Sequence, residues 1–228
     1  MAKKEILIIV PSRSVNSNRA FNVNRFYTNW AYNSSGKSDL CIALDSDDEH
    51  NYPRISGVIY EVNDPMRMIP TLNTVARKYC NDYKYIAFFG DDHVIQTPGW
   101  EDKFIEYLQP YADSDKVAFA YGNDLLQGVR LPTAVVVTSA LVRKTGYMVL
   151  PTLLHMYADN YWLKVGDVLG AIKYFPDVVF EHLHPDNGKA VRDEQYSDVA
   201  RLVGYDESMY NTWLNDSNTI PNILELNS

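Results

Sequence analysis

The sequence predicts an α/β protein with a central, mostly parallel sheet covered by helices on both faces. Apolar runs of strand length alternate along the 228 residues with segments of helical spacing, which is the pattern of βαβ units. Some of these runs are continuously apolar, as in strands that are covered on both sides. Polar and charged residues follow several of the runs, and ligands of such sheets bind at the carboxyl ends of the strands.

The elements follow from the apolar spacing. The run EILIIV predicts a first strand over 5–10, and Val23, Phe26, Tyr27 and Trp30 lie on one face of the helix that comes next. Further strands are expected over residues 39–45, 57–62, 85–89 and 116–122, from residue 134, and over 175–185. Further helices are expected over residues 71–80 and 99–110, in a short segment that ends before Gly146, and over 157–166 and 189–218. Residues 216–218 and Pro221 are expected to loosen the tail.

Composition limits the function classes. The net charge is −8 and no basic run is visible, which argues against a protein that grips an extended nucleic-acid backbone. Cys41 and Cys80 lie in apolar or helical contexts, so a disulfide framework is not expected, which fits a reducing compartment. The first apolar run is too short for a signal-peptide core or a membrane span. We expect a cytoplasmic protein without a membrane partner. The sequence leaves the oligomeric state open.

Two acids follow the buried strand in the segment YIAFFGDDH. Asp91 and Asp92 are expected on a rigid element, and Gly90 lets a ligand approach the backbone. Such a pair is often merely solvated or caps a turn. However, hard cations such as Mg²⁺ and Mn²⁺ prefer oxygen ligands, so the pair is also a candidate metal site.

A second group comes from the late segment FEHLHPDNGK. His182 and His184 are two positions apart on an expected strand and would face the same side. One of them is a candidate metal ligand, and Lys189 is a candidate phosphate ligand. The alternative is a pair of half-exposed histidines near a turn.

Two further strand ends carry charge. Arg13 follows Pro11 and Ser12, and its guanidinium group could donate two hydrogen bonds to a phosphate or to a nucleobase edge. The alternative is that Arg13 only pairs with a nearby aspartate. Asp45 ends the second strand and is the better functional candidate of its loop. We interpret the acids that follow it as a solvated acidic loop, namely Asp47, Asp48 and Glu49.

Asp159 lies among aromatic residues in the segment YADNYW. Partial desolvation would raise its pKa and suit it to act as a general base. The alternative is a helix N-cap, a position that aspartate favours. Dinucleotide-binding, P-loop and serine-nucleophile motifs are absent from the sequence.

These segments together resemble those of GT-A type glycosyltransferases over about residues 5–200. The segments that carry the resemblance are IIVPSR, ALD, ARKY with YIAFFGDD, YADNYW and EHLHPDNGK. The compound GDDHVIQTPGW and the VPSR and EHLHP elements are also similar to little-characterised single-domain glycosyltransferase-like proteins of bacteria and phages. The resemblance implies a GT-A-like α/β/α sandwich.

The resemblance also implies roles for individual residues. Asp92 matches the metal-binding aspartate, whereas Gly90 stands where many members have a first acid, and Asp91 and His93 are the candidates to compensate for that acid. His184 fits the third protein ligand best and His182 is the alternative, while Asp159 matches the base of inverting members. The expected donor-binding residues are Pro11, Ser12, Arg13, Asp45, Asp91 and Lys189.

We therefore predict a metal-dependent glycosyltransferase. It would use Mn²⁺ or Mg²⁺ and a nucleotide-sugar donor, and we expect this donor to be a UDP-sugar. The acceptor hydroxyl could belong to a glycan, a protein or a modified DNA base, and the sequence does not decide among these three. Residues 1–205 are expected to form the transferase domain and 206–228 a helical tail packed on it or extending from it. The alternatives are a nucleotidyltransferase and a catalytically weak nucleotide- or sugar-binding module.

Overall fold

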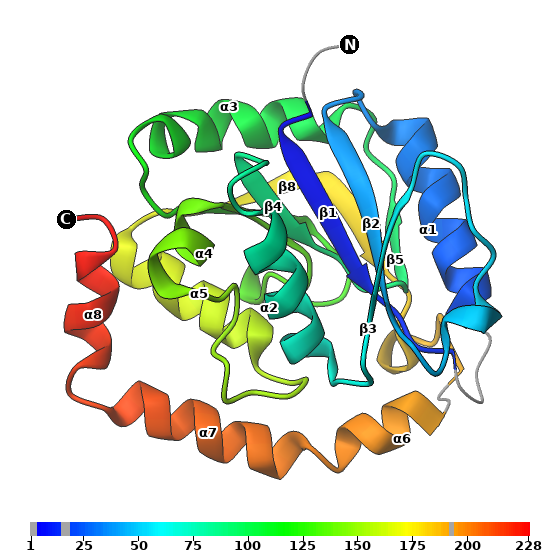
Figure 1. The fold of residues 1–228 in the computed structure, drawn as a ribbon. Coiled ribbons are helices and arrows are strands. Elements are labelled where there is room, and N and C mark those ends of the chain that lie inside the picture. Colours follow the sequence, from blue (N-terminus) through cyan, green and yellow to red (C-terminus); the bar gives the residue numbers. More distant parts are fainter. Residues whose placement is uncertain (1–3, 15–18, 192–193) are drawn as a thin grey trace.

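The computed structural model describes residues 4–14, 19–191 and 194–228, and it confirms the predicted α/β sandwich (Figure 1). Within these residues, eight strands form one curled sheet in the order β3-β2-β1-β4-β7-β6-β8-β5. The strands are β1 (Ile6–Pro11), β2 (Ser38–Asp45), β3 (Ile59–Asn63), β4 (Tyr85–Phe88), β5 (His93–Ile95), β6 (Phe119–Asn123), β7 (Val135–Thr138) and β8 (Ile172–His182).

Strand direction explains where the polar strand ends meet. β1 pairs in parallel with β2 and β4, and β2 pairs in parallel with β3. The carboxyl ends of these four strands therefore share one edge. β6 and β8 are parallel to each other, whereas β7 runs antiparallel to β4 and β6. The short β5 runs antiparallel to β8, with His93 opposite His182, and brings the segment after β4 next to the end of β8.

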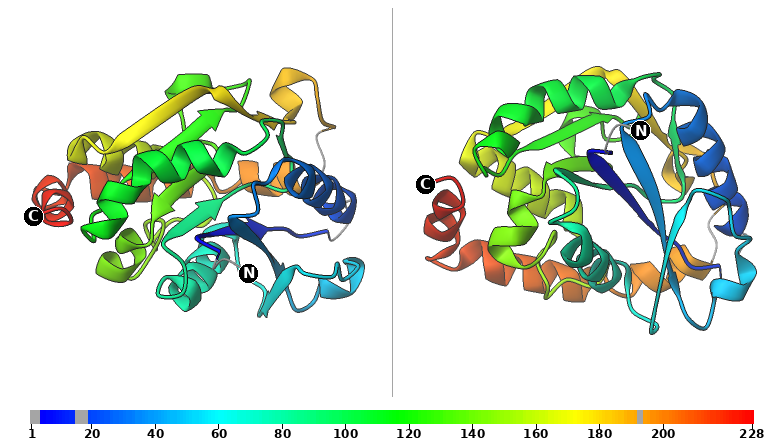
Figure 2. Two further views of the ribbon diagram at one scale, coloured as in Figure 1. Left: turned by 90° about the horizontal axis from the view of Figure 1, so that it is seen from above. Right: turned by 45° about the horizontal axis from the view of Figure 1, so that its top comes forward.

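Helices cover both faces of the sheet, as Figure 2 shows. Leu7 and Ile9 of β1 belong to an apolar cluster with α2, α4 and α5, whereas Ile6, Ile8 and Val10 belong to a second cluster with α1 and α3. Successive strand residues point to opposite faces, so the continuously apolar first strand supplies both cores. The helices are α1 (Arg19–Asn33), α2 (Met68–Tyr79), α3 (Trp100–Asp113), α4 (Ala140–Thr145), α5 (Ala158–Leu169), α6 (Glu194–Ala200), α7 (Val203–Asn215) and α8 (Thr219–Glu225).

The structure corrects several element predictions. The helix expected to end at Pro110 continues to Asp113, and the missing N–H of Pro110 costs only one bond in the last turn. In the part of the tail that the structure describes, α6, α7 and α8 replace the single expected helix, and Pro221 does not loosen the tail. Pro221 lies in the first turn of α8, where backbone N–H groups have no partner within the helix. The predicted boundary at residue 205 lies within α7, and the division into a domain and a tail stays a prediction.

Among the described residues, no helix combines the length and the apolar character that a membrane crossing requires.

Candidate metal and donor site

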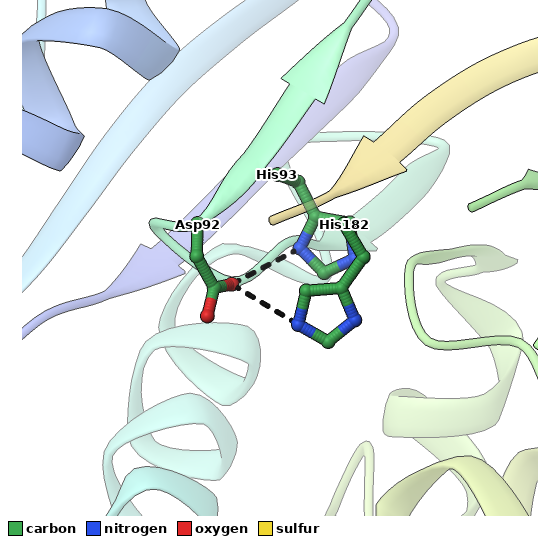
Figure 3. A group of neighbouring side chains, drawn as sticks. All are labelled: Asp92, His93 and His182. Atoms are coloured by element: carbon green, nitrogen blue, oxygen red, sulfur yellow. Dashed lines mark ion pairs between the residues drawn. The ribbon is translucent and has the colours of Figure 1, made fainter. Parts of the chain in front are cut away.

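A four-residue turn after β4 creates the centre of the site. The N–H of His93 donates to the carbonyl of Gly90 at 3.1 Å, which closes the turn and starts β5. The pairing of β5 with β8 then places Asp92 and His93 beside His182 (Figure 3). One ligand atom from each of these three residues lies within 4.8 Å of the other two.

Asp92 occupies the middle of this group. Its Oδ1 lies 3.4 Å from Nε2 of His182 and 3.6 Å from Nδ1 of His93, and its Oδ2 lies 3.8 Å from a guanidinium nitrogen of Arg19. Burial favours the neutral acid, but the hydrogen bond and charge of His182, with the charge of Arg19, hold the pKa of Asp92 well below its usual value. Asp92 is therefore an ionised carboxylate at neutral pH.

His182 is the better placed of the two clustered imidazoles. Burial alone would lower its pKa, but the adjacent Asp92 carboxylate outweighs burial and raises it. Nδ1 of His182 is buried and has no hydrogen-bond partner among the described residues. Nε2 faces Asp92, and the face of the ring stacks on His93 with the ring centroids 4.4 Å apart.

His93 is held differently. Its Nδ1 accepts the N–H of Gly90 at 3.1 Å, so the ring proton lies on Nε2, which is 3.4 Å from Oγ1 of Thr133. Thr133 in turn donates to Asp124 at 2.8 Å. Burial lowers the pKa of His93 to about 3. The ring is neutral, and its Nδ1 lone pair is already used, which leaves Asp92 and His182 as the better pair of metal ligands.

Gly90 has a steric role in this corner. A Cβ at this position would lie 2.6 Å from Oδ1 of Asp92 and 3.0 Å from Nδ1 of His93. Both approaches are closer than normal van der Waals contact. The glycine thus leaves the space that the Asp92 carboxylate occupies, which is a physical reason for the departure from an acid at this position.

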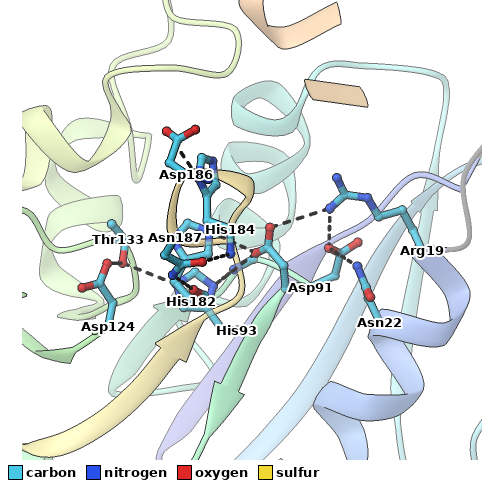
Figure 4. A network of polar contacts seen from close by, with 12 residues as sticks. Arg19, Asn22, Asp91, His93, Asp124, Thr133, His182, His184, Asp186 and Asn187 are labelled. Carbon is cyan, nitrogen blue, oxygen red and sulfur yellow. Dashed lines mark hydrogen bonds and ion pairs between the residues drawn. The ribbon is translucent and has the colours of Figure 1, made fainter. Parts of the chain in front are cut away.

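Asp91, which the resemblance places in the donor site, is almost fully buried. One of its oxygens accepts the hydroxyl of Ser12 at 2.5 Å. The other oxygen pairs with Arg19 at 2.8 Å, as Figure 4 shows. Burial raises the pKa of Asp91, while the charge of Arg19 opposes that rise. Asp91 connects the end of β1 to the start of α1 and orients Arg19 toward Asp92.

Sequence reasoning missed Arg19. Arg19 begins the helix that follows the first strand, close to the predicted ligand edge, and its basic character was the available signal. His93 was considered only as a substitute for the missing acid, because the three-residue β5 is too short to be recognised from its pattern.

The second polar group lies at the ends of β1 and β2. Arg13 forms an ion pair with Asp45 and a two-pronged pair with Asp47 at 2.9 Å, and these bonds raise its pKa further. Asp45 also accepts the N–H of Met66 at 3.3 Å. In this structure Arg13 therefore pairs with nearby aspartates, which is the alternative that the sequence had left open.

Asp48 is not part of a solvated loop, so that interpretation was wrong. Its side chain is fully buried, and it accepts the Asn51 amide at 2.7 Å and the N–H of Ser14. A buried carboxylate needs such donors. Asp47, in contrast, is exposed as expected.

His184 and Lys189 lie beside the metal corner. β8 ends at His182, and His184 precedes the short turn Pro185–Asn187, whose Asp186 N–H donates to Nδ1 of His184 at 3.1 Å. The His184 ring meets the His182 ring edge-on, with centroids 5.1 Å apart. Lys189 forms an ion pair with Glu181.

Asp159 lies in the first turn of α5 and is half-buried. Tyr157 holds the N-cap position, so the N-cap alternative for Asp159 was wrong. Burial raises the pKa of Asp159, and the charge of His182 acts in the opposite direction. The side chain therefore lies within electrostatic reach of the metal corner and binds protons more readily than an ordinary aspartate.

Solved structures with a similar fold are glycosyltransferases. The mannosyltransferase PcManGT from Pyrobaculum calidifontis, in complex with GDP-Man and Mn²⁺, matches 83% of this chain with a TM-score of 0.56 and 12% identity. S. aureus TarS matches 80% of the chain with a TM-score of 0.53 and 11% identity, over 37% of its own length. The 1–349 form of TarS matches 97% of the chain and 70% of its own length, with a TM-score of 0.51 and 12% identity.

At such identities these similarities establish the fold alone. The chain spans 59% of the length of PcManGT, less than two thirds. No family model matches the sequence, and no curated protein matches it either.

Proposed function

We propose that this protein is a metal-dependent glycosyltransferase that moves a sugar from a nucleotide-sugar donor to an acceptor hydroxyl. One observation carries the proposal. In a fold shared with glycosyltransferases, the ionised Asp92 and the imidazole of His182 meet at the sheet edge where ligands of such folds bind. The two residues come from separate strand ends, and the neighbouring Arg19 adds positive charge.

The donor atoms of this corner suit a divalent cation. A carboxylate with an imidazole fits Mn²⁺, and Mg²⁺ is usually held by one or two carboxylates and substrate phosphates. Asp92 and His182 would hold the ion, with His184 as a further candidate beside them. When bound, the ion would neutralise the negative charge that grows on the diphosphate as the sugar leaves. The space left by Gly90 supports this assignment, because it keeps the carboxylate at the centre of the corner.

The donor would lie along the carboxyl ends of β1 and β2. Pro11 and Ser12 would line its path, Arg13 and Asp45 would contact the nucleoside, and Asp91 would act by orienting Arg19 toward the phosphates. Lys189 is a further phosphate ligand if its ion pair with Glu181 opens. PcManGT is a precedent for a nucleotide-sugar, GDP-Man, bound by this fold. For this chain we propose a UDP-sugar.

Asp159 would act as the general base. Its carboxylate would take the proton of the acceptor hydroxyl as the oxygen attacks the anomeric carbon. Burial raises the pKa of Asp159, which strengthens it as a proton acceptor while the group is ionised. This role requires an inverting reaction, and a product that retains the donor configuration would contradict it.

The test is the release of nucleoside diphosphate from a panel of UDP-, GDP- and dTDP-sugars, each with Mn²⁺, with Mg²⁺ or with EDTA. We expect metal-dependent release, strongest with one UDP-sugar, and its loss in Asp92→Asn. The matched control is Asp177→Asn, an exposed acid paired with Lys103, which should behave as the wild type. Absence of release from every donor, or release that EDTA does not reduce, would contradict the proposal. Donor binding without release would support the binding-module alternative.

A further inference from the structure

Helix α7 reaches back to a loop that lies some fifty residues earlier in the chain. Asp206 is fully buried, and its carboxylate accepts three successive backbone N–H groups. These are Leu154 at 2.8 Å on Oδ1, with His155 at 2.9 Å and Met156 at 2.7 Å on Oδ2. These N–H groups belong to a loop without regular structure, so no hydrogen bond of a helix or sheet pairs them. Asp206 therefore fixes the backbone of residues 154–156.

The same helix also holds the next residues of the chain. Tyr157 has a φ of 67°, in the left-handed region, and its ring stacks on Tyr210 with centroids 5.3 Å apart. The hydroxyl of Tyr210 donates to the carbonyl of Asn160 at 3.3 Å. Asp206 and Tyr210 are four positions apart on α7 and share one face. Consequently α7 holds the chain immediately before and immediately after Asp159.

We propose that Asp206 is a positioning residue that sets the place of Asp159 relative to the metal corner. The proposal rests on the proposed function, in which Asp159 is the general base. Asp159 is the second residue of α5, so its carboxylate moves with any shift in the start of that helix. A shift of about 1 Å in a reacting group can cost about 100-fold in rate. The C-terminal helices, predicted as a tail, would thus contribute to catalysis.

A second buried carboxylate provides a matched control. Glu101 of α3 is fully buried and accepts the N–H of Ser35 at 2.8 Å and the hydroxyls of Ser38 at 2.8 Å and Ser34. It therefore makes three hydrogen bonds, as Asp206 does. However, it lies where β2 begins, at the opposite edge of the sheet from the proposed site. Asp206→Asn and Glu101→Gln both replace one acceptor oxygen by an NH₂ group that faces donors, so both should lower stability.

The experiment compares kinetics and hydrogen–deuterium exchange in the two variants at a temperature where both are folded. Asp206→Asn should lower kcat for transfer by about 10- to 100-fold with a nearly unchanged KM for the donor, because the donor site is intact. Its amides at 154–161 should exchange faster. Glu101→Gln should keep kcat within about twofold of the wild type. Equal kcat losses in the two variants, or an unchanged kcat in Asp206→Asn, would overturn the proposal.

Two further measurements distinguish failure of the Asp206 proposal from failure of the proposed function. If Asp206→Asn does not fold, Asp206→Glu replaces it, since this change keeps the charge but moves the carboxylate by one methylene relative to the N–H groups of residues 154–156. It should lower kcat without changing the donor KM, and an unchanged kcat would count against the proposal. If the wild type releases no sugar from any donor, the proposed function fails instead. Exchange at 158–161 then decides whether Asp206 fixes the start of α5.

Discussion

Nε2 of His182 lies 3.4 Å from Oδ1 of Asp92, at the place where the four-residue turn after β4 meets the end of β8. The contact depends on the antiparallel pairing of β5 with β8, which sets His93 opposite His182. His93 supports the turn through Gly90 and is itself held by Thr133. The proposed metal site therefore depends on the Asp92–His182 pair.

The first prediction concerns the ligands of the ion. Asp92→Asn and His182→Ala should each weaken Mn²⁺ binding by about tenfold or more, because each removes one protein ligand. His184→Ala should have a much smaller effect, since Nδ1 of His184 accepts the N–H of Asp186. Titration calorimetry with Mn²⁺ in the presence of UDP measures the three affinities. A larger loss in His184→Ala than in His182→Ala would favour the ligand that the resemblance implies.

The second prediction concerns Gly90. Gly90→Ala adds a methyl group that would lie 2.6 Å from Oδ1 of Asp92, so the carboxylate must move. The backbone of Gly90 does not have a positive φ, and alanine is therefore tolerated there without backbone strain. We expect a change in unfolding free energy within about 1 kcal/mol but weaker Mn²⁺ binding. Denaturant titration and calorimetry measure the two quantities. Unchanged affinity would show that the position of the carboxylate is not critical.

The sequence predicted most of the α/β order, because its strands and helices carry long apolar patterns. β1 is recognisable since residues 6–10 are all buried and all apolar. β5 has only three residues, one of them histidine, and no pattern distinguishes it from a loop. The prediction that acids meet at the ends of parallel strands followed from topology alone, and the structure places Asp45 and the Asp91–Asp92 turn at that edge.

Other features depend on contacts between distant parts of the chain. Nothing local in the sequence distinguishes Asp48, which is buried, from Asp47, which is exposed. The difference arises because the N–H of Ser14 donates a hydrogen bond to the carboxylate of Asp48. Likewise, Asp206 lies in an ordinary helical segment, and its donors come from residues 154–156. Such partners become visible only when the fold brings the segments together.

The third prediction concerns Asp159. Asp159→Asn removes the proposed proton acceptor and should lower kcat by about 100-fold or more, while Mn²⁺ affinity stays near that of the wild type. Burial raises the pKa of Asp159, and the base must be ionised. The rate should therefore fall as the pH drops through this raised value, at a higher pH than for an ordinary aspartate. The pH profile of kcat tests this, and a kcat within a few-fold of the wild type in Asp159→Asn would exclude the role.

The fourth prediction concerns pH and stability. His155 is half-buried, and burial lowers its pKa from 6.5 to about 4. The folded state therefore disfavours a proton that the unfolded chain binds below pH 6.5. The contribution of the neutral His155 to the free energy of unfolding is fully present above about pH 6.5. It is lost progressively as the pH falls toward 4, by at most about 3 kcal/mol. The charges that face this ring are Asp206 and Asp92, which raise its pKa, and Arg67 and Arg19, which lower it.

Urea titrations at several pH values measure this loss. His155→Gln removes the titrating group and should flatten the stability profile between pH 6.5 and 4 relative to the wild type. His50→Gln is the control, because this histidine lies in an exposed turn away from the sheet core. If the two variants show the same pH dependence, the burial of His155 does not contribute to the acid sensitivity.

The most direct test of the account is anomalous diffraction at the manganese edge from crystals soaked with Mn²⁺ and UDP. The account predicts one strong peak between the Asp92 carboxylate and Nε2 of His182, with diphosphate oxygens beside it and the nucleoside toward Arg13 and Asp45. A peak that contacts neither Asp92 nor His182, or UDP bound with no manganese at this corner, would contradict the central claim.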